Sequence, residues 1–178
     1  MRLKFYLAGA MEAAKDLGAG WRVGVTEKLH SMGHETLDPC LFEPDKLKGL
    51  HTKRLPDTFT NRITGETITP THWHQLKLAK EPTYFQRFLK YMRLIIKYDI
   101  DMLVNHADAV ICLWNSETSF GAGTHSELSY SYLNNIPVYC VETHPMPAWA
   151  LGCCTQIFKS FEELYEFLDK DLNEGFAD

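Results

Sequence analysis

Short apolar runs alternate with segments of helical periodicity along most of the chain. Residues 109–114, Ala-Val-Ile-Cys-Leu-Trp, form a continuous apolar run, which is typical of a strand covered on both faces. Shorter runs predict four further strands, at residues 3–8, 34–37, 136–141 and 155–158. The pattern therefore predicts a sheet whose strands are separated by longer connections.

Helical periodicity is strongest over residues 84–105, where apolar side chains recur at steps of three and four. A second helix is predicted over residues 19–32, ended by Gly33 as a C-cap, and a third over residues 121–134. The last helix begins at Ser160, which is followed three residues later by a glutamate, as in a capping box. Strands that alternate with helices predict an α/β fold, with a parallel sheet and helices on both of its faces.

Residues 40–82 interrupt this alternation. The segment contains four prolines and a turn signal at Thr64-Gly65. It is long for a connection in a compact domain, and long loops are usually functional or mobile. We therefore predict a single domain over residues 1–178, with an insertion at about 40–82 that caps a site.

The strand order predicts where a ligand would bind. In a parallel sheet of this kind, ligands bind beyond the carboxyl ends of the strands, at the point where the strand order reverses. The first and third strands are the predicted neighbours at that reversal. Their C-terminal loops are Gly9-Ala10-Met11 and residues 115–124, so these two loops are expected to meet at one site.

The composition is ordinary for a globular protein, and the charge narrows the choice of partners. The chain has 178 residues, of which 45% are hydrophobic and 23% charged, with a net charge of -5. No dense block of Lys and Arg is present, which disfavours a nucleic-acid polymer as partner, and no apolar run is long enough to span a membrane. The five cysteines are odd in number, so reduced thiols in a cytoplasmic protein are expected.

Residues 115–127 carry the candidate chemistry. Gly121 and Gly123 would let the backbone approach a ligand closely. Taken alone, however, the two glycines are better explained by a tight turn. Ser126 replaces the third glycine of a dinucleotide fingerprint, and no lysine supports a P-loop, so no cofactor motif is present. Glu127 is expected in about the first helical turn, where the positive helix end favours its ionised form.

An ionised carboxylate at the mouth of a sheet crevice could attack an anomeric carbon or stabilise an oxocarbenium ion. We expect Glu127 to face a pocket large enough for a sugar ring; a glutamate that merely suits the helix dipole is the alternative. Asp99 and Asp101 lie two residues apart at the end of the long helix, so they face differently and one can point into the crevice. Asp108, which directly precedes the third strand, is interpreted as a cap or turn residue.

Three motifs agree in order, spacing and structural context with one known superfamily. They are Tyr6-Leu-Ala-Gly-Ala-Met11, then Asp99-Ile-Asp-Met-Leu, then Gly123-Thr-His-Ser-Glu127-Leu. Together they resemble the nucleoside 2-deoxyribosyltransferase superfamily, which includes nucleotide N-glycosidases. The similarity covers residues 3–38 and 94–141.

The resemblance implies a flavodoxin-like doubly wound sheet of five parallel strands, and a homo-oligomer in which a neighbouring subunit often completes the site. It implies Glu127 as a nucleophile that forms a glycosyl-enzyme intermediate. It also implies Asp99 as a partner carboxylate near the leaving base or sugar, and Tyr6 as a hydroxyl that orients the glutamate. The residues that would line the base or sugar pocket are Gly9, Ala10 and Met11.

Two departures from the superfamily bear on the reaction. Its transferases usually carry an aspartate six residues before the glutamate, where this chain has Gly121. Hydrolysis is therefore slightly favoured over base exchange. Asp99 stands one residue further from Asp108 than the pattern of the superfamily would place it, so Asp101 remains a rival for its role.

A 5′-phosphate would find several candidate partners. The nucleotide hydrolases of the superfamily tend to carry a serine at the position of Gly121, and here Thr118 and Ser119 lie slightly earlier. Ser119 and the amides from Gly121 to Thr124 could bind the phosphate. Arg22 could assist, although a solvated helix arginine is an equal alternative.

Other residues with potential chemistry favour simpler interpretations. His125 could act as an acid or a phosphate donor, but a surface histidine on a helix is preferred. His72-Trp-His74 could suggest a metal pair, yet no nearby Cys or carboxylate completes a site, so we predict no metal. Cys153 and Cys154 lack a CxxC partner, and packing is preferred there too.

These observations predict an enzyme that cleaves the N-glycosidic bond of a small-molecule nucleoside or nucleoside 5′-monophosphate, by hydrolysis or base exchange. The alternative is a non-catalytic module that binds or senses a nucleotide, in which Glu127 accepts hydrogen bonds from a ribose. An NAD glycohydrolase is a third hypothesis, because it uses similar carboxylate chemistry.

Overall fold

The chain divides into two compact units. The computed structural model describes residues 2–11, 13–14, 16, 18–40, 59–60, 67–68 and 82–174. The first unit comprises Met1–Pro39 and Met102–Asp178, and the second comprises Cys40–Asp101. The boundary at Cys40 agrees with the predicted start of the insertion, whereas the second unit continues beyond residue 82 into the long helix. That the chain forms a single domain stays a prediction.

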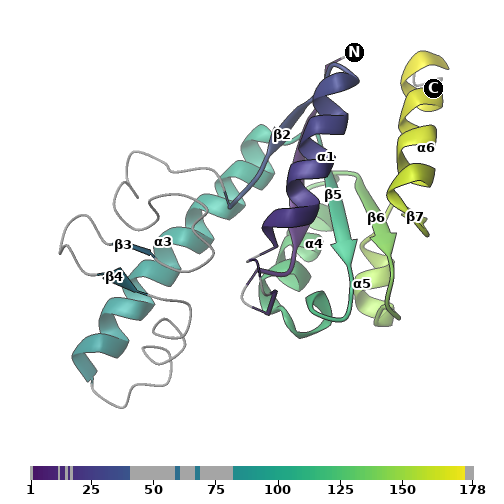
Figure 1. The fold of residues 1–178 in the computed structure, drawn as a ribbon. Coiled ribbons are helices and arrows are strands. Elements are labelled where there is room, and N and C mark those ends of the chain that lie inside the picture. Colours follow the sequence, from purple (N-terminus) through teal and green to yellow (C-terminus); the bar gives the residue numbers. More distant parts are fainter. Residues whose placement is uncertain are drawn as a thin grey trace. The chain divides into compact units, whose positions relative to one another are not determined.

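The first unit is built around a parallel sheet of five strands (Figure 1). The strands are β1 (Lys4–Gly9), β2 (Glu35–Leu37), β5 (Ala109–Trp114), β6 (Val138–Glu142) and β7 (Gln156–Phe158). Their order is β2-β1-β5-β6-β7, and every pairing is parallel. This is the flavodoxin-like order, in which the reversal lies between β1 and β5. The predicted fold class is confirmed, and the first and third predicted strands are neighbours.

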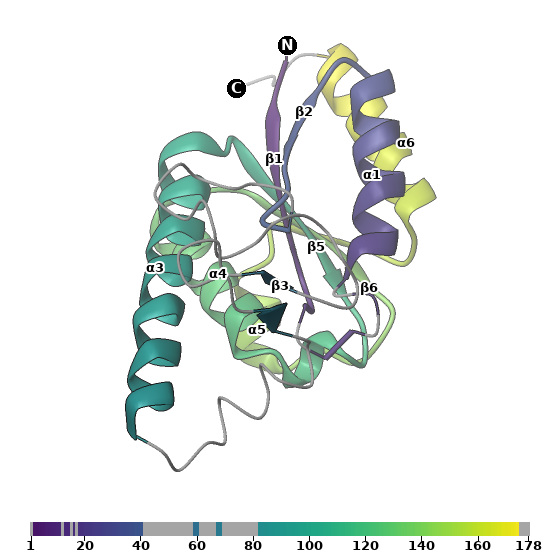
Figure 2. The same cartoon turned by 60° about the vertical axis from the view of Figure 1, so that its left-hand side comes forward.

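One face of the sheet is covered by α1 (Ala19–Ser31) and α6 (Phe161–Glu174), which lie side by side (Figure 2). Trp21 of α1 stacks on Phe161 of α6, with ring centroids 5.9 Å apart. Since successive side chains of a strand point to opposite faces, Phe5 of β1 faces these helices. It belongs to a buried core with Leu7, Val25, Leu29, Ala109, Ile111, Tyr139, Val141, Phe158, Leu164 and Leu168.

The opposite face of the sheet is covered by α4 (Ala122–Leu133), and the short helix α5 (Ala148–Gly152) packs against α4. Tyr6 points to this face because it alternates with Phe5 along β1. Leu128 of α4 is fully buried against the sheet. The alternation along β1 therefore sends the Tyr6 side chain toward α4, the helix that carries the candidate glutamate.

The predicted long helix is confirmed as α3 (Pro82–His106), whose last residues belong to the first unit, where Met102 is buried. In the second unit, β3 (Phe59–Thr60) and β4 (Thr67–Ile68) form an antiparallel pair. They flank in sequence the predicted turn at Thr64-Gly65, which lies outside the described residues. Neither α3 nor any other helix in the described part of the chain is long and apolar enough to cross a membrane.

The predicted end of α1 is confirmed by its backbone hydrogen bonds. Gly33 has a φ of 86°, and its N–H donates to the carbonyl oxygen of His30. The N–H of His34 donates to the carbonyl oxygen of Leu29. This Schellman arrangement ends a helix at a left-handed residue. One bond of the predicted capping box at the start of α6 forms, because the Ser160 hydroxyl accepts the N–H of Glu163. The Glu163 carboxylate instead accepts the N–H of Lys159.

Two short helical segments are absent from the sequence-based prediction. They are the 3-10 helix η1 (Thr118–Phe120), which follows β5, and α5, which connects β6 to β7. Parallel neighbours such as β6 and β7 need a crossover connection, and α5 supplies it. Each segment is too short to show helical periodicity in the sequence.

The start of α1 requires a glycine. Gly18 has a φ of 72°, and the Asp16 carboxylate accepts the N–H groups of Gly18 and Gly20 over 3.0 and 2.6 Å. A Cβ atom at Gly18 would overlap the carbonyl oxygen of Ala10 and the Nη1 atom of Arg22. Any other residue would therefore combine backbone strain with a steric clash.

We expect Gly18→Ala to lower the free energy of unfolding by about 1–3 kcal/mol, the usual cost of holding a non-glycine residue in a left-handed conformation. Gly24→Ala is the matched control, because Gly24 lies exposed on the same helix with open space around its Cα. It should raise the free energy of unfolding by about 0.5–1 kcal/mol. Chemical denaturation measures both variants, and equal stabilities would contradict the prediction.

Candidate functional site

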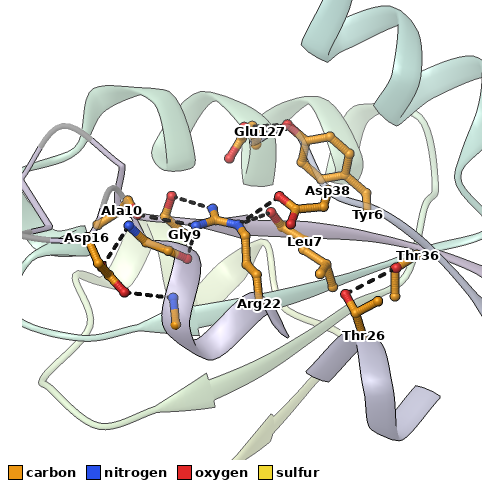
Figure 3. Close-up of polar contacts among 12 residues, drawn as sticks. Tyr6, Leu7, Gly9, Ala10, Asp16, Arg22, Thr26, Thr36, Asp38 and Glu127 are labelled. Carbon is orange, nitrogen blue, oxygen red and sulfur yellow. Dashed lines mark hydrogen bonds and ion pairs between the residues drawn. The ribbon is translucent and has the colours of Figure 1, made fainter. Parts of the chain in front are cut away.

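A hydrogen bond joins two side chains that the sequence predicts at the centre of the site. The Tyr6 hydroxyl donates to Oε1 of Glu127 over 2.7 Å, although the residues lie 121 positions apart. Figure 3 shows the pair between β1 and α4. Tyr6 is fully buried and Glu127 is partly buried. The Glu127 carboxyl thus has one hydrogen-bond donor held in place by the sheet, the Tyr6 hydroxyl.

Glu127 lies in the second turn of α4, rather than in about the first turn as predicted. The helix begins at Ala122, so Glu127 lies beyond the turn in which the helix end acts most strongly on a charge. The side chain of a helical residue leans toward the N-terminus of its helix. Glu127 is therefore deeper along the sheet than predicted, with its side chain directed back toward the carboxyl ends of the strands.

The environment of the Glu127 carboxyl disfavours its charged form. Burial raises the pKa of Glu127, while the hydrogen bond from Tyr6 and the positive charge of Arg22 lower that pKa. The net shift is upward, because desolvation outweighs these two favourable groups. That the helix end favours ionisation stays a prediction. The ionised form of Glu127 therefore depends on Tyr6 and Arg22.

Thr118 connects the two loops that the sequence predicts at the site. Its hydroxyl accepts the N–H of Ala10 over 3.3 Å, and it lies 2.9 Å from the carbonyl oxygen of Leu113 and from Oδ1 of Asn115. Thr118 is fully buried. The loops that follow β1 and β5 therefore meet, as the strand order predicts, and the Thr118 hydroxyl is engaged within the protein.

The residues at the start of α4 remain candidates for ligand binding. Gly121 precedes the helix in an extended conformation without a side-chain cap, and a Cβ atom at Gly123 would meet nothing within 4 Å. Thr124 is buried, and the Ser119 hydroxyl donates to the carbonyl oxygen of Ser116 over 2.7 Å. The first N–H groups of any helix lack partners within it. Phosphate binding here stays a prediction.

The predicted pocket residues after β1 differ in their surroundings. A Cβ atom at Gly9 would lie 2.9 Å from Cζ2 of Trp21, so close packing against α1 explains the glycine. Ala10 is buried and Met11 is partly buried. That these residues line a base or sugar pocket stays a prediction.

Arg22 is fully buried, so its interpretation as a solvated helix arginine is wrong. Its guanidinium donates to the main-chain carbonyls of Leu7, Gly9 and Gly18 (Figure 3). It also lies 3.6 Å from Oδ1 of Asp38, which the sequence did not nominate as a site residue. The position of Asp38 directly after a strand, at the carboxyl edge of the sheet, is the signal that could have identified it. Phosphate binding by Arg22 stays a prediction.

Asp99 and Asp101 lie on α3 in the second unit, where Asp99 is partly buried and Asp101 is exposed. Burial and the negative charges of these two aspartates raise the pKa of Tyr98 to about 12. Their roles as partner carboxylates stay predictions. Asp108 lies between α3 and β5, and its Oδ2 accepts the N–H of Lys4, at the start of β1, over 2.8 Å. That Asp108 is a cap or turn residue stays a prediction.

The remaining candidates have structural positions or lie outside the described residues. His125 is partly buried, and its ring packs edge-on against Trp114 with centroids 4.9 Å apart. His72-Trp-His74 lies outside the described residues. None of the five cysteines forms a disulfide. Within the described ranges, no group of three or more His, Cys, Asp or Glu side chains is placed to hold a metal ion.

A cavity of about 550 Å³ lies at the other end of α4. Its walls come from the end of α4, the segment before β6 and the segment before β7, and they include Leu133, Pro137 and Cys154. None of the predicted site residues lines this cavity. That Glu127 faces a pocket large enough for a sugar ring stays a prediction.

The sequence matches no protein-family model and no curated protein. The fold is similar to the solved structure of a 2-deoxyribosyltransferase from the psychrotolerant bacterium Bacillus psychrosaccharolyticus, which is described as a biocatalyst for the industrial synthesis of antiviral and antitumoral nucleosides. The TM-score is 0.54 at 15% sequence identity, and the match covers 91% of this chain and 90% of that chain. At this identity the likeness establishes the fold alone.

The buried carboxyl leads to a prediction about stability and pH. Because the pKa of Glu127 is higher in the folded protein than its ordinary value of 4.5, the folded state holds the proton more tightly. The free energy of unfolding therefore falls as the pH rises from the unfolded-state pKa through the folded-state pKa. Glu127→Gln removes this loss, so at pH 8 it should raise the Tm.

The advantage of Glu127→Gln should shrink below about pH 4.5, where the wild-type carboxyl is protonated in both states. Thermal melts between pH 4 and pH 8 measure the difference. Glu27→Gln, which neutralises an exposed glutamate on α1, should change the Tm little at any pH. A difference between Glu127→Gln and wild type that does not vary with pH would contradict the prediction.

Proposed function

We propose that this protein cleaves the N-glycosidic bond of a nucleoside or nucleoside 5′-monophosphate, with Glu127 as the nucleophile. The observation that carries the proposal is the 2.7 Å hydrogen bond from the Tyr6 hydroxyl to the Glu127 carboxyl. The hydrogen bond from Tyr6 fixes Oε1 of Glu127 and thereby the orientation of the whole carboxylate. A carboxylate with a fixed orientation suits attack on an anomeric carbon by its second oxygen. The fold supports the proposal, since its structural neighbour is a 2-deoxyribosyltransferase.

The proposed reaction has two displacements. A carboxylate oxygen of Glu127 forms a bond to C1′ while the bond from C1′ to the base nitrogen breaks. The electron pair of the broken bond leaves with the base. The departing nitrogen takes a proton from an acid of the site or from solvent. Water then attacks C1′, which releases the sugar and restores the Glu127 carboxylate, while the proton of the water passes to a base.

Hydrolysis is favoured over exchange in this proposal. Gly121 stands where transferases of the resembled superfamily carry an aspartate that handles the incoming base. Without that carboxyl group, water is the favoured acceptor for the glycosyl group. Asp99, with Asp101 as its rival, is proposed as the partner carboxylate, and the protein is proposed to act as a homo-oligomer.

The substrate groups are assigned to the two loops that meet at Thr118. The main chain from Gly9 to Met11 is proposed to lie against the base or sugar. The amides at the start of α4 would receive a 5′-phosphate, because unpaired N–H groups at a helix start favour anions. The residues assigned to this second group are Ser119, Gly121, Gly123 and Thr124.

Base release tests the proposal directly. The protein is incubated with a panel of nucleosides, nucleoside 5′-monophosphates and NAD, and free base is measured by chromatography. Wild type and Glu27→Gln should release base from at least one class. Glu127→Gln should be slower by at least about 10³-fold, on the scale seen when a nucleophile is removed.

The covalent step and the acceptor have separate readouts. Intact-protein mass spectrometry should detect a glycosyl adduct on wild type that is absent from Glu127→Gln. A second free base added to the reaction should leave hydrolysis as the main outcome. Formation mainly of a new nucleoside would show that exchange dominates, which contradicts the preference stated above.

The panel also separates catalysis from binding. A nucleotide that raises the Tm without any release of base would overturn the proposal in favour of a non-catalytic module that senses nucleotides. Release of nicotinamide from NAD alone would replace the nucleoside substrate with NAD. Base release that persists in Glu127→Gln would exclude Glu127 as the nucleophile.

A further inference from the structure

The carbonyl groups of β1 alternate between its two neighbouring strands. The carbonyl oxygen of Leu3 accepts the N–H of Glu35 in β2. The carbonyl oxygen of Lys4 instead accepts the N–H of Asp108, next to β5. Since carbonyls two residues apart along a strand point the same way, the odd-numbered residues of β1 direct their carbonyls toward β2.

The second strand is too short to bind all of these carbonyls. β2 ends at Leu37, whose Cα is paired with that of Tyr6. The carbonyls of Leu7 and Gly9 therefore lie beyond the end of β2. A buried carbonyl without a donor destabilises the folded state. This edge of β1 needs donors from outside the sheet.

Arg22 of α1 supplies those donors. Its Nε donates to the carbonyl oxygen of Leu7 over 3.3 Å, and its Nη2 donates to that of Gly9 over 3.0 Å. Its Nη1 donates to the carbonyl oxygen of Gly18 over 2.8 Å and to that of Ala10 over 3.4 Å. One guanidinium thus holds both ends of the loop between β1 and α1, because only arginine carries five N–H donors in one plane.

The charge of Arg22 is balanced within the protein. Oδ1 of Asp38 lies 3.6 Å from Nε, and neither side chain is more than 2% exposed. The guanidinium carbon lies 4.6 Å from the centroid of the Trp21 ring. Loss of one partner from a buried ion pair leaves an uncompensated charge. The position of the guanidinium is therefore fixed from several sides.

We propose that Arg22 is a positioning residue of the Glu127 site, which fixes the loop after β1 and supplies the buried positive charge that supports the Glu127 carboxylate. The inference rests on the proposed function, since it identifies what prepares the nucleophile. The loop that Arg22 holds is also the loop that donates the Ala10 N–H to Thr118 over 3.3 Å. Arg22 thus influences both the loop after β1 and the Glu127 carboxylate, without itself contacting the substrate.

The charged and titratable groups around Glu127 come from several elements. Tyr6 of β1 and Arg22 of α1 lower the pKa of Glu127, against the larger effect of burial. Asp38, after β2, faces Arg22 (Figure 3). His125 of α4 faces the ring of Trp114. Removal of the charge at position 22 should therefore raise the pKa of Glu127 and reduce the ionised nucleophile at neutral pH.

A positioning role differs in its consequences from phosphate binding. The donors of Arg22 are already engaged by carbonyl oxygens, which a phosphate would have to displace. If Arg22 positions the loop, its replacement changes kcat/KM for nucleosides and for their 5′-monophosphates by the same factor. If Arg22 binds phosphate, only the monophosphates show an increased KM.

Two measurements test the inference without any turnover. The Glu127 carboxyl is titrated by ¹³C NMR in protein labelled at glutamate, with Glu127→Gln identifying the signal. Arg22→Met should raise the Glu127 pKa, while Lys28→Met, which removes an exposed positive charge from the same helix, should leave it unchanged. Arg22→Lys keeps the charge but not the planar set of donors, so the pKa should stay near wild type while amide hydrogen exchange at Ala10 and Gly18 becomes faster.

Kinetics then connect the inference to the reaction. The acid limb of kcat/KM reports the free enzyme, so Arg22→Met should move it to higher pH. Arg22→Lys should keep that limb and lower kcat by about 10²-fold, the cost of a small misplacement of reacting groups. If Arg22→Met does not fold, amide hydrogen exchange and kinetics of Arg22→Lys still test whether Arg22 fixes the loop after β1.

An unchanged Glu127 titration in Arg22→Met would overturn the charge-supporting role. Wild-type exchange at Ala10 and Gly18 in Arg22→Lys would overturn the loop-fixing role, and a rise in KM confined to monophosphates would replace both with phosphate binding. If the NMR and exchange results are as expected but no substrate releases base, the proposed function fails while the structural role of Arg22 stands.

Discussion

The backbone carbonyls at the end of β1 must find hydrogen-bond donors, and the geometry of the site depends on how they do so. β2 stops opposite Tyr6, so the sheet itself cannot bind the carbonyls of Leu7 and Gly9. A buried guanidinium takes the place of the missing strand. Because the same group also binds Gly18, both ends of the loop between β1 and α1 are held beside the end of β1.

The candidate nucleophile shows a balance between burial and charge. Burial excludes water from the Glu127 carboxyl and strengthens every electrostatic contact around it, but it also disfavours the ionised form. Tyr6 and Arg22 oppose that penalty from different elements, one by a hydrogen bond and the other by charge. Perturbed carboxyls of this kind often occur at functional sites, since a reactive group is rarely the most stable choice at its position.

The fold is similar to that of an enzyme with which the sequence shares only 15% identity. Crossover geometry constrains the arrangement of parallel strands far more tightly than it constrains the identity of individual residues. A fold can host many activities, so the argument for function must come from the site. In this protein that argument rests on Tyr6 and Glu127, on the two loops joined by Thr118, and on the charge of Arg22.

The sequence by itself determined the five strands of the sheet and the long helix α3, but not the short segments η1 and α5. Apolar runs and helical periodicity predicted the longer elements because these signals are local. The motifs also nominated Tyr6 and Glu127, which the structure joins by a hydrogen bond. Only the tertiary structure decided that Arg22 is buried and that desolvation raises the pKa of Glu127. Burial and charge pairing depend on residues such as Arg22 and Asp38, which are distant in sequence and meet only when the chain folds.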